Sequence, residues 1–270
     1  MYSILFAPRQ EQVEELSADL WESGTAGTIE EDQSIRAFFE DTYDPGELIR
    51  KYEILEMRRE PDTGPMEFAR EDWEPIYVGE KFFVAPPWLE RPTPPGRFRL
   101  TLGNGRAFGT GRHESTQLML SAMERCIAPG MTVLDVGAGS GILSLAAVQL
   151  GAIRVFGCDI YLESVFEAAH LPGLCYFAGS ADAVQDNLAD FVLVNISARV
   201  IDAIAGDLKR VAKPNGLLLL SGFVEERVPA CCDPEMIWEQ AGWQCWLCRG
   251  EAIVVQEEEP GLKVHAKQWW

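Results

Sequence analysis

The sequence predicts an α/β protein in which a doubly wound parallel sheet is preceded by a small α+β domain. The 270 residues correspond to about two domains at roughly 150 residues each. In the last two thirds, apolar runs alternate with helical segments at intervals typical of a parallel sheet. In the first third, shorter elements follow the order β-α-β-β-α-β. The chain is therefore expected to contain two domains of different architecture.

The elements of the first third follow one another closely. The first helix carries Val13, Leu16 and Leu20 on one stripe, and the second begins at Asp44-Pro45. The six elements are expected at residues 2–6, 10–23, 25–30, 34–39, 44–51 and 53–58. Their order predicts a ferredoxin-like domain, which we place at residues 1–88.

A proline-rich connection separates this domain from the parallel sheet. Pro92, Pro94 and Pro95 favour a stiff extended linker, placed at residues 89–105. The sheet domain is expected at 106–258 and a tail at 259–270. Buried strands of a parallel sheet are continuously apolar, because helices cover both faces. Such runs lie at residues 133–136, 155–159, 191–195 and 217–223.

Composition and charge narrow the class of protein. No apolar stretch is long enough to cross a bilayer, no secretory signal is visible, and seven irregularly spaced cysteines suggest reduced thiols, so we expect a soluble cytoplasmic protein. The net charge of −19 disfavours direct binding to nucleic acid or to a membrane. Residues 1–90 hold 8 basic and 22 acidic side chains, a net charge of −14. This acidic part either serves solubility alone or recognises a basic protein.

A glycine turn follows the first predicted strand of the sheet. Gly137, Gly139 and Gly141 form a GxGxG pattern ahead of a helical run, which suits a tight turn close to an anionic group. The spacing differs from the GxGxxG of dinucleotide enzymes. Asp135 lies two residues before the first glycine and suits a cationic ligand. S-adenosyl-L-methionine, which carries an ammonium and a sulfonium, has this character.

Polar residues at the ends of neighbouring strands extend this site. Asp159 ends the next strand, 18 residues after Gly141, and suits the ribose hydroxyls. Ser180 and Asp182 follow a further strand, where the adenine is expected. Each aspartate taken alone is also explained as a cap or turn residue.

Asn195 ends the predicted strand at residues 191–195, where open α/β sheets place their active sites. Methyl transfer from a sulfonium requires an oriented amine and the exclusion of water. The amide oxygen of Asn195 can accept an N–H of that amine. An asparagine that stabilises a turn is the alternative.

With these motifs the chain resembles PrmA, the bacterial methyltransferases of the large-subunit ribosomal protein numbered eleven. The resemblance rests on AFGTGRHEST at residues 107–116, LDVGAGSGIL at 134–143, VNI at 194–196, Asp159 and EDW at 71–73. It implies a class I methyltransferase fold, with cofactor contacts at Thr116, Gly137, Asp159 and Asn195. It also implies an amino-terminal domain that docks a ribosomal protein, and methylation of lysine ε-amines and an amino-terminal amine.

The AFGTGRHEST segment contains two further candidates. Phe108 supplies either an apolar wall beside the cofactor or ordinary core packing. His113 either accepts the proton of the amine or braces the loop. Thr116, with Ser115, begins a helix beside the cofactor turn.

Three departures from the family pattern concern the substrate and turnover. Arg112 stands where a histidine is expected, Ser197 where leucine is common, and the stretch from Asp159 to Asn195 is short. The alternative is therefore a cofactor-binding relative with another substrate or without turnover, which acts as an interaction factor. Arginine methylation is disfavoured because VNIS lacks paired glutamates, and a nicotinamide oxidoreductase is disfavoured by the glycine spacing.

Four cysteines near the carboxyl terminus raise the possibility of zinc. They are Cys231, Cys232, Cys245 and Cys248. The second pair lies in an extended run beside Trp243 and Leu247, which favours small buried thiols instead. We expect no metal site.

Overall fold

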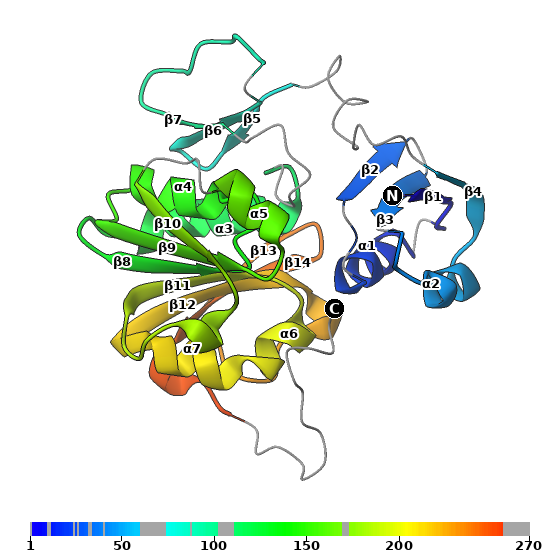
Figure 1. Ribbon diagram of the computed structural model, residues 1–270. Coiled ribbons are helices and arrows are strands. Elements are labelled where there is room, and N and C mark those ends of the chain that lie inside the picture. Colours follow the sequence, from blue (N-terminus) through cyan, green and yellow to red (C-terminus); the bar gives the residue numbers. More distant parts are fainter. Residues whose placement is uncertain are drawn as a thin grey trace.

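The computed structural model describes residues 2–9, 12–23, 25, 27–31, 34–39, 41–59, 74–86, 88–101, 111–168 and 173–255. A small sheet with two helices lies beside a larger sheet flanked by helices, and a short three-stranded sheet lies at one end of the larger unit (Figure 1). Within the described residues, no helix is long and apolar enough to cross a membrane.

The small sheet forms from the acidic first third. Its elements are β1 (Tyr2–Phe6), α1 (Val13–Glu22), β2 (Gly27–Glu31), β3 (Ser34–Phe39), α2 (Gly46–Lys51) and β4 (Ile54–Arg59). This is the expected β-α-β-β-α-β order, and the strands lie in the order β2-β3-β1-β4 with antiparallel neighbours. Leu16 and Leu20 of the predicted apolar stripe are buried against Phe6. The stripe therefore holds α1 on the sheet, while Val13 stays exposed at its start.

The larger sheet has seven strands in the order β10-β9-β8-β11-β12-β14-β13. The four predicted apolar runs are its central strands, and neighbours among β8 to β12 pair in parallel. β14 runs antiparallel to both of its neighbours, β12 and β13. The strands are β8 (Thr132–Val136), β9 (Arg154–Asp159), β10 (Leu174–Ala178), β11 (Ala189–Asn195), β12 (Ala212–Val224), β13 (Met236–Gln240) and β14 (Trp243–Arg249).

Helices cover both faces of this sheet, which explains why its strands are continuously apolar. One core contains residues of α3 and α4, and the other contains residues of α6 and α7. The bounds are α3 (Glu114–Cys126), α4 (Ile142–Gln149), α5 (Leu162–Ala168), α6 (Ala198–Ala203) and α7 (Ala205–Val211). Short 3₁₀ turns follow three of the strands, namely η3 (Ala181–Ala183), η4 (Glu225–Arg227) and η5 (Gly250–Ala252).

The region expected as the end of the first domain and the linker packs differently from the prediction. Strands β5 (Ile76–Val78), β6 (Phe82–Ala85) and β7 (Phe98–Thr101) form a separate sheet. Phe82 and Leu100 are fully buried in the same core as Met119 of α3. The described part of the proline-rich stretch leads back to β6, with which β7 pairs in parallel. Packing assigns these strands to the larger unit.

Candidate functional site

The glycine turn has the backbone conformation that the sequence predicts. Gly137, Gly139 and Gly141 have φ values of +72°, +52° and +77°, which side chains strongly disfavour. A Cβ on Gly137 would lie 2.7 Å from Cγ2 of Ile196. Gly141 is the N-cap of α4, so no side chain occupies the first amides of that helix. The turn therefore presents backbone N–H groups and a helix amino end to a ligand.

Asp159 fastens this turn to the end of β9. Its Oδ2 accepts the N–H of Gly139 at 2.8 Å, and its Oδ1 accepts the N–H of Tyr161 at 2.9 Å. Burial raises the pKa of the carboxyl, and the hydrogen bonds from the backbone act in the opposite direction. Three backbone N–H groups, those of Gly139, Ile160 and Tyr161, donate to this carboxylate, which leaves about one of its roughly four lone pairs for a ligand. A hydrogen bond to the ribose is compatible with this geometry.

Asp135 lies beneath the turn, inside β8. The residue is 1% exposed, its Oδ2 accepts the Ser144 hydroxyl at 2.6 Å, and its Oδ1 has no hydrogen-bond partner. Burial raises the pKa of Asp135 to about 7, and the hydrogen bond from Ser144 opposes that rise. Its predicted contact with a cationic ligand therefore depends on a buried oxygen.

A tyrosine missed by the sequence analysis lies near Asp135. The ring of Tyr176 covers Gly157, where a Cβ would lie 2.1 Å from the ring. Gly157 is the register partner of Asp135 in the neighbouring strand. The Tyr176 hydroxyl is buried without a partner at hydrogen-bond geometry. Burial, followed by the charge of Asp135, raises its pKa, and the Ser144 hydroxyl opposes that rise. A glycine inside a strand, at residue 157, is the sequence signal that could have indicated a large neighbouring side chain.

Asn195 and Thr116 lie together, although they are 79 residues apart in the sequence. Asn195 ends β11, and its Nδ2 donates to Oγ1 of Thr116 at 3.3 Å. Thr116 lies in the first turn of α3 and is 3% exposed. Oδ1 of Asn195 is buried and has no partner. This arrangement holds an amide with its oxygen left as a hydrogen-bond acceptor.

His113 is the N-cap of α3. Its Nδ1 accepts the N–H of Ser115 at 3.2 Å and lies 2.8 Å from the Ser115 hydroxyl. The ring packs edge-on against Trp243, with centroids 4.4 Å apart, and burial lowers its pKa to about 4. Of the two interpretations that the sequence left open, these contacts favour a histidine that braces the loop. Phe108 lies outside the described residues.

The predicted adenine edge follows β10. Ser180 precedes η3, and the N–H of Gly179 donates to the Asp159 carbonyl at 2.9 Å. Neighbouring strands are about 4.8 Å apart. The end of β10 therefore lies next to the end of β9, and the adenine contact of Ser180 stays a prediction.

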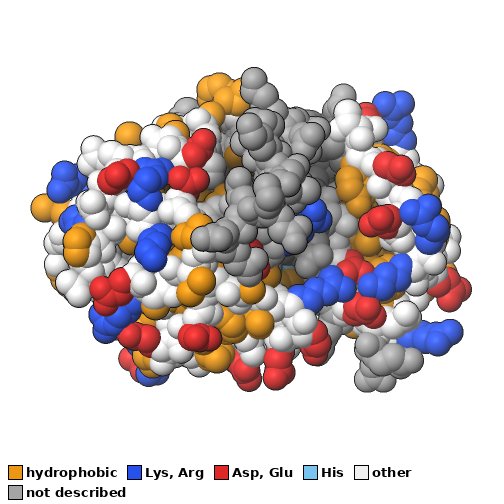
Figure 2. All heavy atoms as spheres, turned by 90° about the horizontal axis from the view of Figure 1, so that it is seen from below, with side chains coloured by type: hydrophobic (Ala, Val, Ile, Leu, Met, Phe, Trp, Pro, Cys, Tyr) orange, Lys and Arg blue, Asp and Glu red, His pale blue; other side chains and the backbone are white. Residues whose placement is uncertain are grey.

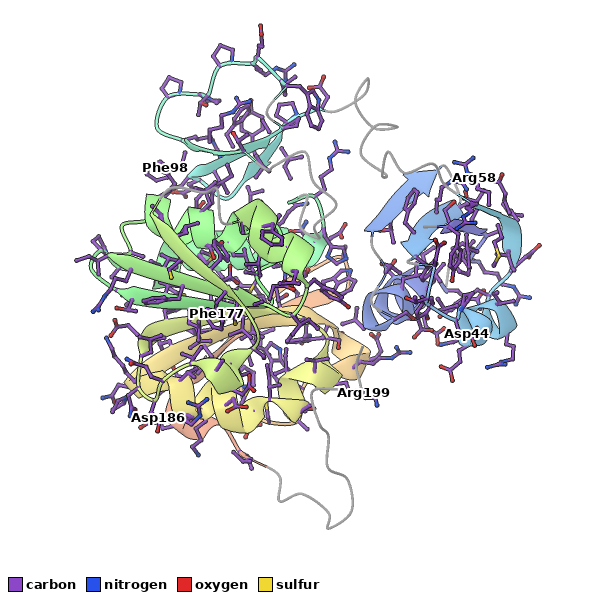
Figure 3. All side chains as sticks on the ribbon, viewed as in Figure 1. Asp44, Arg58, Phe98, Phe177, Asp186 and Arg199 are labelled. Carbon is purple, nitrogen blue, oxygen red and sulfur yellow. The ribbon has the colours of Figure 1, made fainter. Side chains whose placement is uncertain are left out.

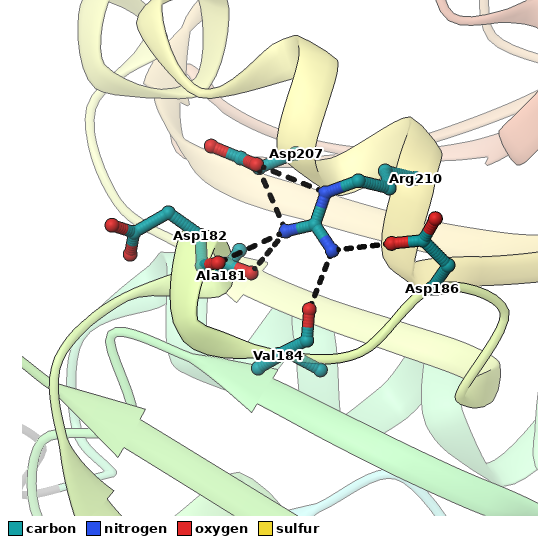
Figure 4. Close-up of polar contacts among 6 residues, drawn as sticks. All are labelled: Ala181, Asp182, Val184, Asp186, Asp207 and Arg210. Atoms are coloured by element: carbon teal, nitrogen blue, oxygen red, sulfur yellow. Dashed lines mark hydrogen bonds and ion pairs between the residues drawn. The ribbon is translucent and has the colours of Figure 1, made fainter.

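Arg210 of α7 binds the turn that follows β10, and the sequence analysis missed this residue. Its guanidinium donates to the carbonyls of Ala181, Asp182 and Val184 and pairs with Asp186 and Asp207 (Figure 4). The sequence did contain an acidic partner for Arg210, namely Asp207 three residues earlier on the same helix. Such pairs are common on exposed helices, so this one did not stand out.

The four candidate zinc ligands do not converge. Cys245 contacts Met119 in the core on the α3 face, whereas Cys231, Cys232 and Cys248 lie in the core on the α7 face. Sγ of Cys232 lies 2.7 Å from Sγ of Cys248. In the part of the chain that is described, no group of three or more His, Cys, Asp or Glu side chains is arranged to hold a metal ion.

Comparisons with known proteins identify similar sequences. The family model described as Ribosomal protein L11 methyltransferase (PrmA) matches residues 7–249. A ribosomal protein L11 methyltransferase of Burkholderia mallei (strain NCTC 10229) is 34% identical over 203 residues, which cover 71% of this chain and 67% of that protein. One of Prochlorococcus marinus (strain MIT 9313) is 34% identical over 198 residues, which cover 66% of this chain and 65% of that protein. The matches thus span about two thirds of these relatives.

A solved structure has a similar fold. The ribosomal protein L11 methylase from Lactobacillus delbrueckii subsp. bulgaricus has a TM-score of 0.60 and 26% sequence identity, and the match covers 66% of this chain and 99% of that chain. The larger domain has the class I methyltransferase fold that the sequence predicts.

Proposed function

Because the chain belongs to the ribosomal protein L11 methyltransferase family, we propose that it transfers methyl groups from S-adenosyl-L-methionine to amines of a basic ribosomal protein. The observation that carries this proposal is the buried, unpartnered Oδ1 of Asn195, held by Thr116 at the carboxyl end of β11. A hydrogen-bond acceptor at that edge of an open α/β sheet suits an amine nucleophile.

The residues at this edge fit the cofactor of the family. The positive-φ glycines leave room where a Cβ on Gly137 would collide with Ile196, and the amino end of α4 suits a carboxylate. Gly137 and Gly139 would border the methionine part, Asp159 would accept the ribose hydroxyls, and Ser180 would lie at the base. When bound, the cofactor supplies an electrophilic methyl group on a sulfonium.

Asn195 orients the nucleophile. Its amide oxygen accepts one N–H of the incoming amine, which directs the nitrogen lone pair away from Asn195 and toward the cofactor site. The Thr116 hydroxyl holds the amide in place, because it accepts from Nδ2. A lysine amine has an ordinary pKa near 10.4 and must lose a proton before it reacts. We assign that proton to water, because the pKa of His113 is lowered to about 4.

Recognition of the protein substrate falls to the acidic amino-terminal domain. The first 90 residues carry a net charge of −14, which attracts a basic ribosomal protein and brings its amines near the active-site edge. The acceptor is a lysine ε-amine, an amino-terminal amine, or both. Because ribosomal proteins are its substrates, we place the reaction in the cytoplasm.

Methylation of ribosomal protein L11 by the purified chain tests this function. With labelled S-adenosyl-L-methionine, the expected product is L11 carrying label on amines, located by mass spectrometry of its peptides. Thr116→Val should lower kcat about tenfold, because the amide of Asn195 loses its hydroxyl partner, whereas Thr116→Ser should retain activity. If the wild-type chain transfers no label to L11, this substrate assignment is wrong.

A further inference from the structure

Two cysteines that the proposed function does not use meet in the core on the α7 face. Sγ of Cys232 lies 2.7 Å from Sγ of Cys248, and the residues are 6% and 0% exposed, respectively. Non-bonded carbon atoms pack best at about 3.5–4.0 Å, and the sulfurs of a disulfide are about 2.05 Å apart. The two sulfurs are therefore closer than ordinary packing brings them, and a bond between them needs only a small further approach.

Backbone hydrogen bonds hold Cys232 against β14. Before it, the N–H of Cys231 donates to Oδ1 of Asp202, on α6, at 2.9 Å. After it, the N–H of Glu235 donates to the carbonyl of Leu247, on β14, at 2.7 Å. Because the chain is held on both sides, the two thiols face each other in the folded protein without rearrangement of the backbone.

A layer formed by α6 and α7 covers these thiols. Ile201 of α6 and Leu208 of α7 belong to the same core as both cysteines. Figure 3 shows the layer between the labelled Asp186 and Arg199. This side of the larger unit, seen from below in Figure 2, carries acidic and basic side chains with hydrophobic ones between them. A reagent in solution therefore reaches the pair through Cys232, which alone of the two keeps some exposure.

We propose that Cys232 and Cys248 are a site of reversible oxidation, at which a low-molecular-weight disulfide such as oxidised glutathione converts the two thiols into a disulfide bond. Disulfides in the cytoplasm are usually transient and respond to redox conditions. The pair is a dithiol under reducing conditions and becomes a disulfide when the oxidant accumulates. This site does not depend on the proposed function.

The oxidation proceeds by two exchanges. The thiolate of Cys232 attacks a sulfur of oxidised glutathione, which releases one glutathione thiolate and leaves a mixed disulfide. The thiolate of Cys248 then attacks Sγ of Cys232, and the second glutathione thiolate leaves. The two protons that the cysteines lose end on the two glutathiones, so one disulfide forms and one is reduced. The hydrogen bond with Cys231 lowers the pKa of Cys232, but the bond with Cys248 and burial outweigh it and raise the pKa to about 12. Thiolate is therefore scarce at neutral pH, and the exchange takes hours.

The bond closes a loop that contains the edge strand β13. This strand is the last in the sheet order and pairs with β14. Met236 and Ile237, on β13, are each 48% exposed. An edge strand with exposed apolar side chains invites pairing with other chains. A disulfide across the loop restricts the unfolded chain, so it opposes detachment of β13 from the sheet.

The cysteine pair lies away from the active-site edge. Cys248 is opposite Leu218 in β12, whereas Asn195 is opposite Ser221 in the same strand. At the rise of a strand, these two positions are about 10 Å apart. Oxidation should therefore change stability and leave cofactor binding unchanged.

Mass spectrometry of the oxidised protein tests the pairing. The full-length protein carrying Cys175→Ser, which removes an exposed thiol, is incubated overnight with oxidised glutathione. It is then denatured, blocked with N-ethylmaleimide and cut by glutamyl endopeptidase after Glu235 and Glu239. The expected product is a linked pair of peptides, one containing Cys232 and the other Cys248, lighter by two hydrogen atoms than the two reduced peptides together. Recovery of both peptides unlinked overturns the proposal.

Single substitutions in the same background assign the bond. Cys232→Ala and Cys248→Ala should each abolish the linked peptides, whereas Cys231→Ala and Cys245→Ala should retain them. Cys245 is the matched control, because it shares a peptide with Cys248 but contacts Met119 in the other core. A linkage that persists in Cys232→Ala, or one that is lost in Cys245→Ala, overturns the assignment.

Thermal unfolding measures the consequence of the bond. The partners are 16 residues apart, so oxidation should raise Tm by at least about 5 °C, and dithiothreitol should reverse the rise. Cys248→Ala treated in the same way should show no change. Linked peptides without a rise in Tm overturn the stabilising role. The affinity for S-adenosylhomocysteine, measured by calorimetry, should stay within about twofold on oxidation, and a larger loss contradicts the separation of the pair from the active-site edge.

Discussion

The two domains treat their buried polar groups in opposite ways. In the small domain, the carboxylate of Asp19 has a donor on each oxygen, and the hydroxyl of Tyr52 is used by that carboxylate. In the larger domain, Asp135 Oδ1, Tyr176 OH and Asn195 Oδ1 are buried without partners. Unpartnered buried groups cost stability, so their concentration around the glycine turn indicates a place prepared for a ligand. The polar groups of the small domain stabilise its fold, whereas those of the larger domain are available to a ligand.

Asp135 should have the largest effect on how the free energy of unfolding changes with pH. The folded pKa of about 7 lies above the ordinary value near 3.8. The stability that depends on its protonated form is therefore complete below about pH 4 and is lost as pH rises through about 7. Relative to Asp135→Asn, the wild-type free energy of unfolding should fall by up to roughly 4 kcal/mol between these limits.

Urea unfolding of both proteins at a series of pH values measures that difference. Asp190→Asn is the control, because hydrogen bonds from Lys213 and Thr132 hold the pKa of Asp190 below its ordinary value, so its contribution has the opposite sign. If the free energy of unfolding changed with pH in the same way in the wild type and in Asp135→Asn, the raised pKa that we infer for the unpartnered carboxyl would be wrong.

Gly137→Ala should prevent binding at the prepared site. A side chain at φ +72° costs about 1–2 kcal/mol, and its Cβ would also collide with Ile196. Affinity for S-adenosylhomocysteine, measured by calorimetry, should fall at least about a hundredfold. Gly130→Ala has a similar backbone penalty at φ +91° but meets nothing within 4 Å, so it should retain affinity. Equal losses in the two variants would assign the effect to strain alone.

Arg210→Gln should weaken cofactor binding without altering chemistry. Without the guanidinium, the carbonyls of Ala181 and Val184 are no longer tied to α7, and the edge expected to hold the adenine loosens. The Kd for S-adenosylhomocysteine should rise about tenfold, while kcat at saturating cofactor stays near wild type. Arg249→Gln, remote from this turn, is the comparison variant. A fall in kcat with unchanged Kd would refute a role in cofactor positioning.

The same substitution should have opposite effects in the two domains. Tyr52→Phe removes a hydrogen bond to a charged acceptor and should destabilise by about 1.5 kcal/mol. Tyr176→Phe removes a buried hydroxyl without a partner and should stabilise the ligand-free protein by about 1 kcal/mol. Thermal unfolding of both variants checks the signs. Destabilisation by both changes would remove the contrast between the domains.

Much of the site could be predicted because its signals are local. The glycine turn, Asp159 and Asn195 each lie at the end of an apolar run, and strand ends of a parallel sheet meet at one edge. The position of β7, in the stretch expected to be a linker, has a physical reason as well. Prolines indicate a stiff path but not its direction, and β7 finds its partner only when Leu100 packs into the core of the larger domain.

The sequence by itself determined the order of elements in the first third, the four central strands and the conformation of the glycine turn, because periodicity and backbone sterics act between near neighbours. Only the tertiary structure decided the contact of Thr116 with Asn195 and the attachment of Asp19 to Arg227. These contacts join residues 79 and 208 positions apart, and no local pattern encodes which distant side chain will fill a space or complete a hydrogen bond.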